Sequence, residues 1–95
     1  MSRIHPEAMA EMVEAAAFYE ERAPGLGQDF FEEVEGVFRL VVENPDAGTS
    51  REPPYRRFVC RRFPFVVIYR ETPGGVRILA VMHQRRRPGY WKDRG

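Results

Sequence analysis

The chain has 95 residues, of which 43% are hydrophobic and 31% charged, and its net charge is +1. This length suits a single domain over residues 1–95 with one modest core. No apolar run is long enough to cross a membrane, and the first residues lack the charged and apolar segments of a secretory signal. Because Cys60 is the only cysteine, no internal disulfide can form, and we expect a reducing, cytoplasmic environment.

Charge is distributed unevenly along the chain. Residues 1–50 carry eleven acids and three arginines, a net charge of −8, whereas residues 51–95 carry eleven arginines and Lys92 against three acids, a net charge of +9. Arginine offers a planar fork of N–H donors for phosphate or carboxylate. We therefore expect the basic half to bind a polyanion or an acidic protein.

Two amphipathic helices are predicted in the first half. Ser2–His5 is a candidate for a brief first strand, and Pro6 suits the first position of a helix. Apolar residues then recur at helical spacing, with glutamates on the opposite, solvated face. The predicted core stripe of this helix is Met9, Met12, Val13, Ala16 and Tyr19.

The second helix follows a break at Ala23-Pro24-Gly25-Leu26-Gly27 and ends before Asn44-Pro45. Gly36 inside it should cost about 1 kcal/mol relative to alanine, and a close approach of the first helix would explain it. The predicted apolar face of this helix is Phe30, Phe31, Val34, Val37, Phe38 and Val41.

The second half is predicted to be a polar loop over residues 46–54 followed by three strands. These are Tyr55–Cys60, Phe63–Tyr69 and Val76–Met82, the last two joined at Pro73-Gly74-Gly75. The middle strand is apolar on both faces and should be central, with a bulge or an unpaired position at Pro64. The order β-α-α-β-β-β predicts an α+β fold in which a helical hairpin packs on one face of a small antiparallel sheet.

The strongest functional signal is a group of arginines and aromatic residues in the basic half. We predict a surface that binds a macromolecular partner, composed of Arg56, Arg57, Arg61, Arg62, Arg85, Arg86, Arg87, Tyr90 and Trp91. No histidines, cysteines or acids have metal-ligand spacing, and no glycine-rich phosphate loop occurs, so we expect neither a metal nor a cofactor.

Several pieces occur in an order that is typical of one family. They are Ala8…Glu11…Tyr19, Pro24-Gly25-Leu26-Gly27…Phe30, Asn44-Pro45, Arg62-Phe63-Pro64-Phe65…Ile68-Tyr69 and Ile78-Leu79-Ala80-Val81…His83…Arg85-Arg86…Pro88…Tyr90-Trp91. In these pieces the chain resembles the RelE/ParE superfamily of toxins from type II toxin–antitoxin modules, closest to the plasmid-stabilisation, ParE-like branch. The resemblance implies the β-α-α-β-β-β fold and a cytoplasmic toxin neutralised by a cognate antitoxin.

The superfamily divides by target, and both targets remain open at this point. ParE-like members poison DNA gyrase, which requires a contact surface, here Arg85–Trp91; this is the first hypothesis. RelE-like members cut messenger RNA in the ribosome. A metal-independent endoribonuclease of that kind would use His83 for proton transfer, Arg62 and Arg85 on the phosphate, and Tyr90 for proton transfer or base stacking. Tyr55 and Glu52 are further proton carriers, whereas the lysines common in RelE-like nucleases are missing, since Lys92 is the only lysine.

A third hypothesis is a non-toxic remnant that only binds its antitoxin, so the sequence leaves open whether the protein is an enzyme. The residues also have structural interpretations: His83 bonded to backbone, Tyr90 and Trp91 folded back on the helices, and Arg85-Arg86-Arg87 docking an acidic part of the antitoxin. An acidic, amphipathic antitoxin segment is expected beside the helical hairpin or at the basic end of the sheet.

Overall fold

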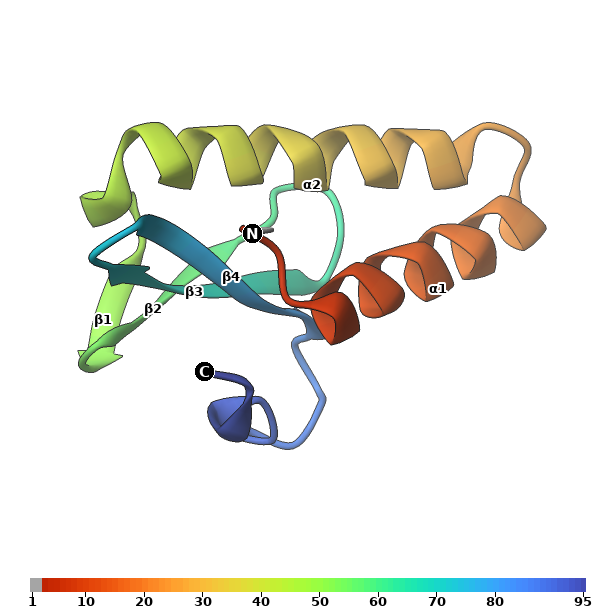
Figure 1. The fold of residues 1–95 in the computed structure, drawn as a ribbon. Helices are drawn as coiled ribbons and strands as arrows, with labels where there is room; N and C mark the ends of the chain where they lie inside the picture. The colour runs from red at the N-terminus through yellow and green to blue at the C-terminus, as the bar shows by residue number, and fades with distance from the viewer. Residues whose placement is uncertain (1–2) are drawn as a thin grey trace.

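The computed structural model describes residues 3–95 and contains two α-helices, two short 3₁₀ helices and four strands. In chain order these elements are α1 (Pro6–Arg22), α2 (Leu26–Glu43), η1 (Pro45–Ala47), β1 (Thr49–Glu52), β2 (Tyr55–Val59), β3 (Phe65–Thr72), β4 (Gly75–His83) and η2 (Lys92–Arg94). The two helices lie on one side of a single antiparallel sheet with the order β1-β2-β3-β4 (Figure 1). The predicted α+β architecture is confirmed.

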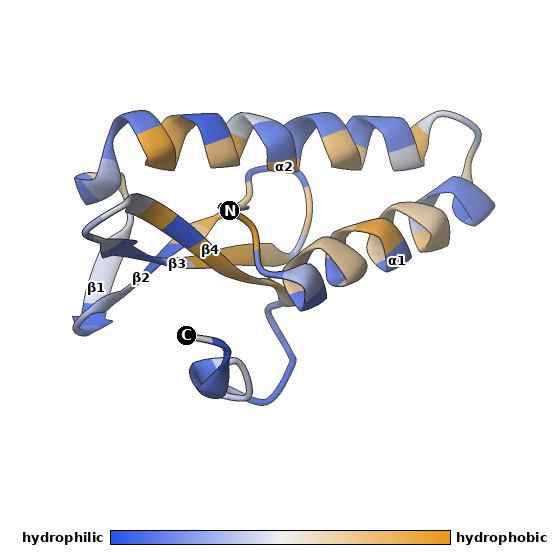
Figure 2. Cartoon of the chain, viewed as in Figure 1, coloured by the Kyte–Doolittle hydropathy of each residue, from blue (hydrophilic) through white to orange (hydrophobic). Residues whose placement is uncertain are grey.

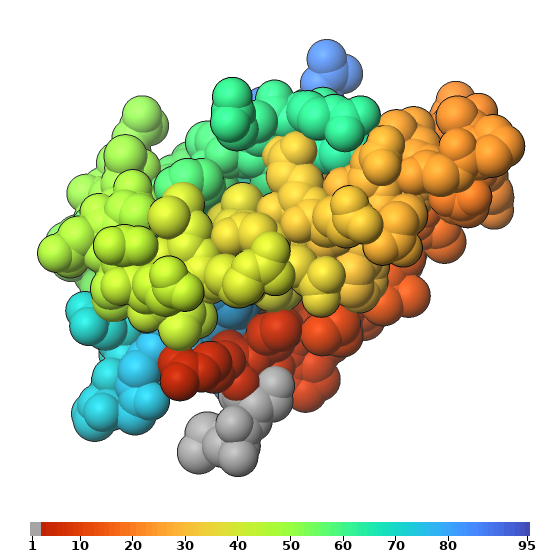
Figure 3. Space-filling model, turned by 90° about the horizontal axis from the view of Figure 1, so that it is seen from above, coloured from red at the N-terminus to blue at the C-terminus, as the bar shows by residue number. Residues whose placement is uncertain are grey.

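The helical hairpin covers one face of the sheet, as expected from its two apolar stripes. In α2, Phe30, Val34 and Val41 are fully buried, and hydrophobic residues alternate with hydrophilic ones along this helix (Figure 2). Seen from the helix side, α2 lies across the molecule, with the N-terminal part of the chain on one flank and the β2–β3 loop on the other (Figure 3).

The predicted core stripe of α1 is wrong for two of its residues. Met9 is 37% exposed and Val13 is 53% exposed. The buried stripe is narrower than predicted and runs through Ala8, Met12 and Ala15, because α1 meets the sheet and α2 along one side only.

The two helices approach each other closely at Gly27. A Cβ atom there would contact the carbonyl oxygen of Ala16, whereas a Cβ at Gly36 would find only the guanidinium of Arg39 at 3.9 Å. The expectation that a close approach explains Gly36 is therefore wrong. The hairpin turn is also held by Glu20, whose carboxylate accepts hydrogen bonds from the backbone N–H groups of Gly25 and Gly27, both at 3.0 Å.

The sheet differs from the prediction at both of its edges. The first strand is reduced to a single parallel bridge between Ile4 and Ile78, because the helix begins at Pro6; Ser2 lies outside the described residues. The predicted loop over residues 46–54 instead contains part of η1 and all of β1. The side chain of Tyr69 fixes this segment, since its hydroxyl donates to the carbonyl of Pro45 (2.7 Å) and accepts from the N–H of Gly48 (2.8 Å).

Strand β3 is central, as predicted from its two apolar faces. Phe65, Val67 and Tyr69 face the helices, whereas Val66 and Ile68 face the other side. Pro64 precedes β3 and lies outside the ladder, as expected for a residue without an N–H.

The far face of the sheet is covered by the C-terminal segment, which returns beneath it (Figure 1). Trp91 is 7% exposed and packs on a second apolar cluster that includes Val66, Leu79 and Met82. Its ring meets that of Tyr55 edge-on, with centroids 4.8 Å apart. A register shift in β4 places both Leu79 and Ala80 on this far face, which enlarges the cluster.

Both ends of the chain attach to the outer side of β4. The N–H of Ile78 donates to the carbonyl of Arg3 (2.6 Å), and the N–H of His5 donates to the carbonyl of Ile78 (2.9 Å). Further along, the N–H of Val81 donates to Glu11 of α1, and the guanidinium of Arg94 donates to the carbonyl of Leu79, both at 3.0 Å. Within residues 3–95, no helix has the length and apolar character needed to cross a membrane.

Candidate functional site

Glu11 of α1 lies at the centre of a polar cluster between α1, β4 and the C-terminal segment. Its side chain is only 13% exposed. The carboxylate accepts hydrogen bonds from the hydroxyl of Tyr90 at 2.6 Å and from two guanidinium nitrogens of Arg94 at 3.0 and 3.2 Å. Arg86 adds a longer ion pair at 3.6 Å. The expectation that the helix glutamates are solvated is therefore wrong for Glu11.

Tyr90 is held within this cluster by its hydroxyl and its ring. The guanidinium of Arg86 lies 3.9 Å from the ring centroid, and that of Arg94 lies at 5.0 Å. Burial, together with the hydrogen bond to Glu11, raises the pKa of Tyr90 well above its usual value. The phenol therefore stays protonated and donates a hydrogen bond to the Glu11 carboxylate.

His83 is the last residue of β4 and lies in a groove beside α1. Its Nδ1 accepts a hydrogen bond from the N–H of Arg85 at 3.1 Å, and its ring meets that of Phe65 edge-on. The groove has a volume of about 360 Å³ and is also lined by Arg86 and Phe18. The structure thus brings His83 and Arg86 together, and it contains the backbone hydrogen bond that the structural interpretation of His83 requires.

Arg61 and Arg62 lie in the β2–β3 loop, beside the start of α2. Glu33 accepts hydrogen bonds from the backbone N–H groups of Arg61 (2.6 Å) and Arg62 (3.1 Å). The guanidinium of Arg62 forms an ion pair with Asp29 at 3.6 Å and lies over the ring of Phe63. Two acids of α2 thus orient this loop.

Arg85 and Arg87 are exposed in the turn that follows β4. Of the four residues predicted for catalysis, His83, Arg85 and Tyr90 come from this one segment. Arg62 comes from the β2–β3 loop and is paired with Asp29. Among residues 3–95, no group of histidines, cysteines and acids is arranged to hold a metal ion.

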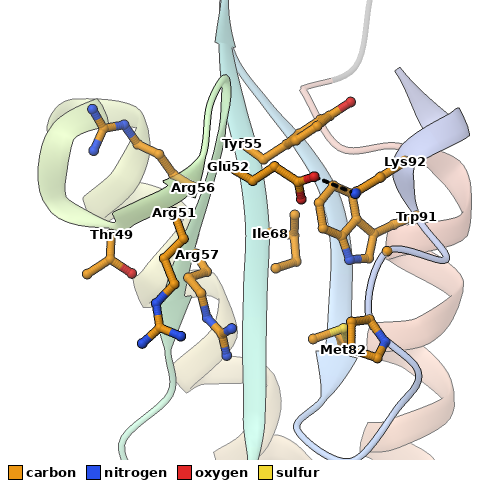
Figure 4. A pocket seen from close by; sticks show the side chains of 12 residues that line it. Thr49, Arg51, Glu52, Tyr55, Arg56, Arg57, Ile68, Met82, Trp91 and Lys92 are labelled. Carbon is orange, nitrogen blue, oxygen red and sulfur yellow. Dashed lines mark hydrogen bonds and ion pairs between the residues drawn. The ribbon is translucent and has the colours of Figure 1, made fainter.

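A second groove, of about 200 Å³, lies on the face of the sheet opposite the helices (Figure 4). Arg51 and Arg57 direct their guanidinium groups the same way at its edge, whereas Arg56 points away and donates to the carbonyl of Gly48 at 2.9 Å. We refer to it as the far-face groove, lined by Arg51, Arg57, Tyr55, Ile68, Met82 and Trp91 among others.

Sequence reasoning missed Glu11 and Arg51 as members of these sites. Glu11 is part of the first piece of the family pattern, which was the available signal. Arg51 falls in a stretch expected to be a loop, where no periodicity indicates a face. Arg57 was predicted as part of the binding surface, and the alternation of a strand places it on the same side as Tyr55, two residues away.

The sequence matches the family model of the ParE toxin of type II toxin–antitoxin systems, parDE, over residues 3–88. The chain belongs to the ParE toxin family. Toxin ParE2 of Mycobacterium tuberculosis strain CDC 1551 / Oshkosh is 29% identical over 87 residues, which cover 90% of this chain and 83% of that protein. The protein of the same name from strain ATCC 25618 / H37Rv matches to the same extent.

The ParE family match covers some parts of the sites and not others. Glu11, His83 and the three arginines at positions 85–87 lie within the matched residues. Tyr90 and Arg94, which hydrogen-bond to Glu11, lie beyond them. The assignment to ParE toxins therefore rests on the helical hairpin, the sheet and the arginine turn.

Proposed function

We propose that this ParE-family toxin acts by binding DNA gyrase and is neutralised by a cognate antitoxin in the cytoplasm. The observation that carries the proposal is the family match over residues 3–88. ParE-like members of the superfamily poison gyrase, and such a function requires an exposed contact surface rather than a set of proton carriers. The contact surface that we propose consists of Arg85, Arg86 and Arg87, with Arg61 and Arg62 beside it.

The state of Tyr90 supports binding over RNA cleavage. Attack by a 2′-hydroxyl needs a base and an acid that both face the phosphate. The hydroxyl of Tyr90 donates a hydrogen bond to Glu11. Burial and that hydrogen bond raise the pKa of Tyr90, so this tyrosine is a poor acid for a leaving oxygen. Arg62 is paired with Asp29. Of the three partners that the ribonuclease hypothesis assigns to His83, Tyr90 and Arg62 are thus engaged elsewhere, and Arg85 remains.

The experiment is a supercoiling and DNA-cleavage assay with the purified toxin and gyrase from its native host. We expect trapped cleavage complexes that disappear when the antitoxin is added. Arg85→Glu/Arg86→Glu should weaken the inhibition by about tenfold or more, because it reverses two charges of the contact surface. His83→Gln should remain largely active, because binding requires no proton transfer.

Two results would contradict the gyrase proposal. In the first, the toxin has no effect on gyrase but cleaves messenger RNA in a translation extract, and His83→Gln abolishes that cleavage. This result would support the ribonuclease hypothesis. The other is the absence of growth arrest on induction although soluble protein accumulates, which would support a non-toxic, antitoxin-binding protein.

A further inference from the structure

Two arginines in the far-face groove have no partner among residues 3–95. Arg51 of β1 and Arg57 of β2 both line the groove, and neither forms an ion pair or a side-chain hydrogen bond within residues 3–95. Other arginines nearby are satisfied: Arg56 by Asp46 and the carbonyl of Gly48, and Arg94 by Glu11. The two guanidinium groups are therefore free to bind an anion.

An irregularity in β1 brings these two charges together. Thr49 pairs with Arg57 and Glu52 pairs with Tyr55, so β1 has one residue more than β2 between the two pairs. The extra residue lets both Arg51 and Glu52 face the groove, where Glu52 is bound by Lys92 at 2.7 Å (Figure 4). Like charges on adjacent strands repel each other, and a bound anion offsets that repulsion.

The floor of the far-face groove is apolar and contains one unsatisfied donor. Ile68 and Met82 form the floor beside Trp91 (Figure 4). The indole N–H of Trp91 is buried and has no hydrogen-bond partner within the described residues. Buried donors of this kind are normally paired; because this nitrogen is enclosed by the protein, the charged donors left to a ligand in the groove are the two guanidinium groups.

We propose that the far-face groove binds a short acidic, amphipathic segment of the antitoxin. Its carboxylates would pair with Arg51 and Arg57, and an apolar side chain between them would rest on Ile68 and Met82. The proposal rests on the proposed function for the existence of the antitoxin. It places the acidic segment on the sheet face opposite the helices, in a groove whose lining includes Pro88 and Gly89, the residues that follow the arginine turn.

The shape and lining of the groove favour a peptide over a nucleic acid strand. A nucleic acid is bound by a long track of positive charge and by exposed aromatic rings on which bases stack. Among the described residues, only two unpaired cations border this groove of about 200 Å³, and the ring of Trp91 is buried against the sheet.

The test is a calorimetric titration of the antitoxin into the wild-type toxin and into Arg51→Gln/Arg57→Gln. We expect the double variant to bind roughly 10- to 100-fold more weakly, because two charge-assisted contacts are lost. Its affinity should also depend less on salt than that of the wild type. Both side chains are on the surface, and thermal unfolding would verify that the variant is folded.

The matched control is Arg22→Gln/Arg39→Gln, which removes two exposed arginines of the helices and hence the same charge. This control should bind the antitoxin with an affinity within about twofold of the wild type, because salt at physiological concentration screens the interaction between distant charges. Equal affinities of wild type and Arg51→Gln/Arg57→Gln would overturn the groove proposal and leave the proposed function intact. A wild-type toxin that does not bind the antitoxin would instead overturn the antitoxin part of the proposed function, and the groove proposal with it.

A parallel titration with a single-stranded oligonucleotide tests the remaining alternative, namely that the far-face groove binds nucleic acid. If Arg51→Gln/Arg57→Gln loses oligonucleotide binding while antitoxin binding is unchanged, the far-face groove is a nucleic acid site and the proposal is wrong. The proposal is supported if the wild type does not bind the oligonucleotide and the double variant binds the antitoxin more weakly.

Discussion

Glu11 joins three parts of the chain that are distant in sequence. Its carboxylate is bound by the backbone of β4, by Tyr90 and by Arg94, whose side chain is 8% exposed. A charge pair that is this little exposed is stable only while both partners and their further hydrogen bonds are present. Removal of the acid leaves the guanidinium of Arg94 with the carbonyl of Leu79 and a distant, exposed Glu7.

We therefore predict that Glu11→Ala lowers the free energy of unfolding by on the order of 3 kcal/mol, the cost of leaving a buried charge without its partner. Urea denaturation measures this value. Glu14→Ala is the matched control, because Glu14 is an exposed glutamate of the same helix, and it should change stability by less than about 0.5 kcal/mol. A similar small effect of both substitutions would show that the Glu11 cluster adds little to stability.

At the level of the elements, the helical hairpin depends on a glycine at the start of α2. Gly27 is buried beneath α1, and its N–H is bound by Glu20 while the carbonyl of Ala16 occupies the space that a side chain would need. Backbone cannot move aside as a flexible side chain can, so even a methyl group would push α1 and α2 apart. Gly36 lies on the open side of the same helix and has no such neighbour.

Replacing each of the two glycines by alanine should therefore change the free energy of unfolding in opposite directions. Gly27→Ala should destabilise the protein by about 2 kcal/mol, the usual cost of overpacking a tight contact. Gly36→Ala should raise stability by up to about 1 kcal/mol, because alanine is the better helix former. Denaturant unfolding of both variants tests the pair, and a stabilised Gly27→Ala would rule out the close helix approach described here.

For the molecule as a whole, burial of tyrosines links stability to alkaline pH. Burial raises the pKa values of Tyr19, Tyr69 and Tyr90. A tyrosine in the unfolded chain ionises near pH 10. Above that pH the unfolded chain loses protons that the folded protein retains, so the free energy of unfolding must fall as the pH rises. Below pH 10 the contribution of these groups is fully present.

We predict that urea midpoints decrease above about pH 9, first because burial raises the pKa of the Cys60 thiol to about 12, and more steeply above about pH 10, where the tyrosines of the unfolded chain ionise. Tyr90→Phe should show a shallower decrease, because it removes one of the groups that titrate differently in the two states. Unfolding curves at several pH values, with tyrosinate absorbance recorded in parallel, provide the measurement. A decrease of the same slope in Tyr90→Phe would exclude Tyr90 as a contributor.

The extent to which the whole structure follows from the sequence depends on whether a segment carries a periodic signal. The apolar stripe of α2 and the doubly apolar β3 were predicted because burial imposes a period on their residues. All four residues of β1 are exposed, so nothing in their order indicates a strand. That strand is fixed instead by Tyr69, a residue twenty-one positions from Gly48.

The sequence predicted which arginines and aromatic residues belong to the candidate site, but not how they are arranged in space. The arginines were identified from composition, but their partners Glu11 and Asp29 come from the helices, far away in the chain. Neighbouring residues such as Arg56 and Arg57 are also directed to opposite sides of the sheet, so one basic cluster in the sequence becomes several separate surfaces in the fold.

The contacts on the outer side of β4 have a consequence for the behaviour of the toxin in a crowded cell. An uncovered strand at the edge of a sheet is a template on which another chain can add and aggregate. Here backbone from the N-terminal segment, the carboxylate of Glu11 and the guanidinium of Arg94 occupy four of the groups that such a chain would use. The N-terminal segment, Glu11 and Arg94 together thus cover this edge against added strands, and the short, charged β1 is the edge that stays open to other chains.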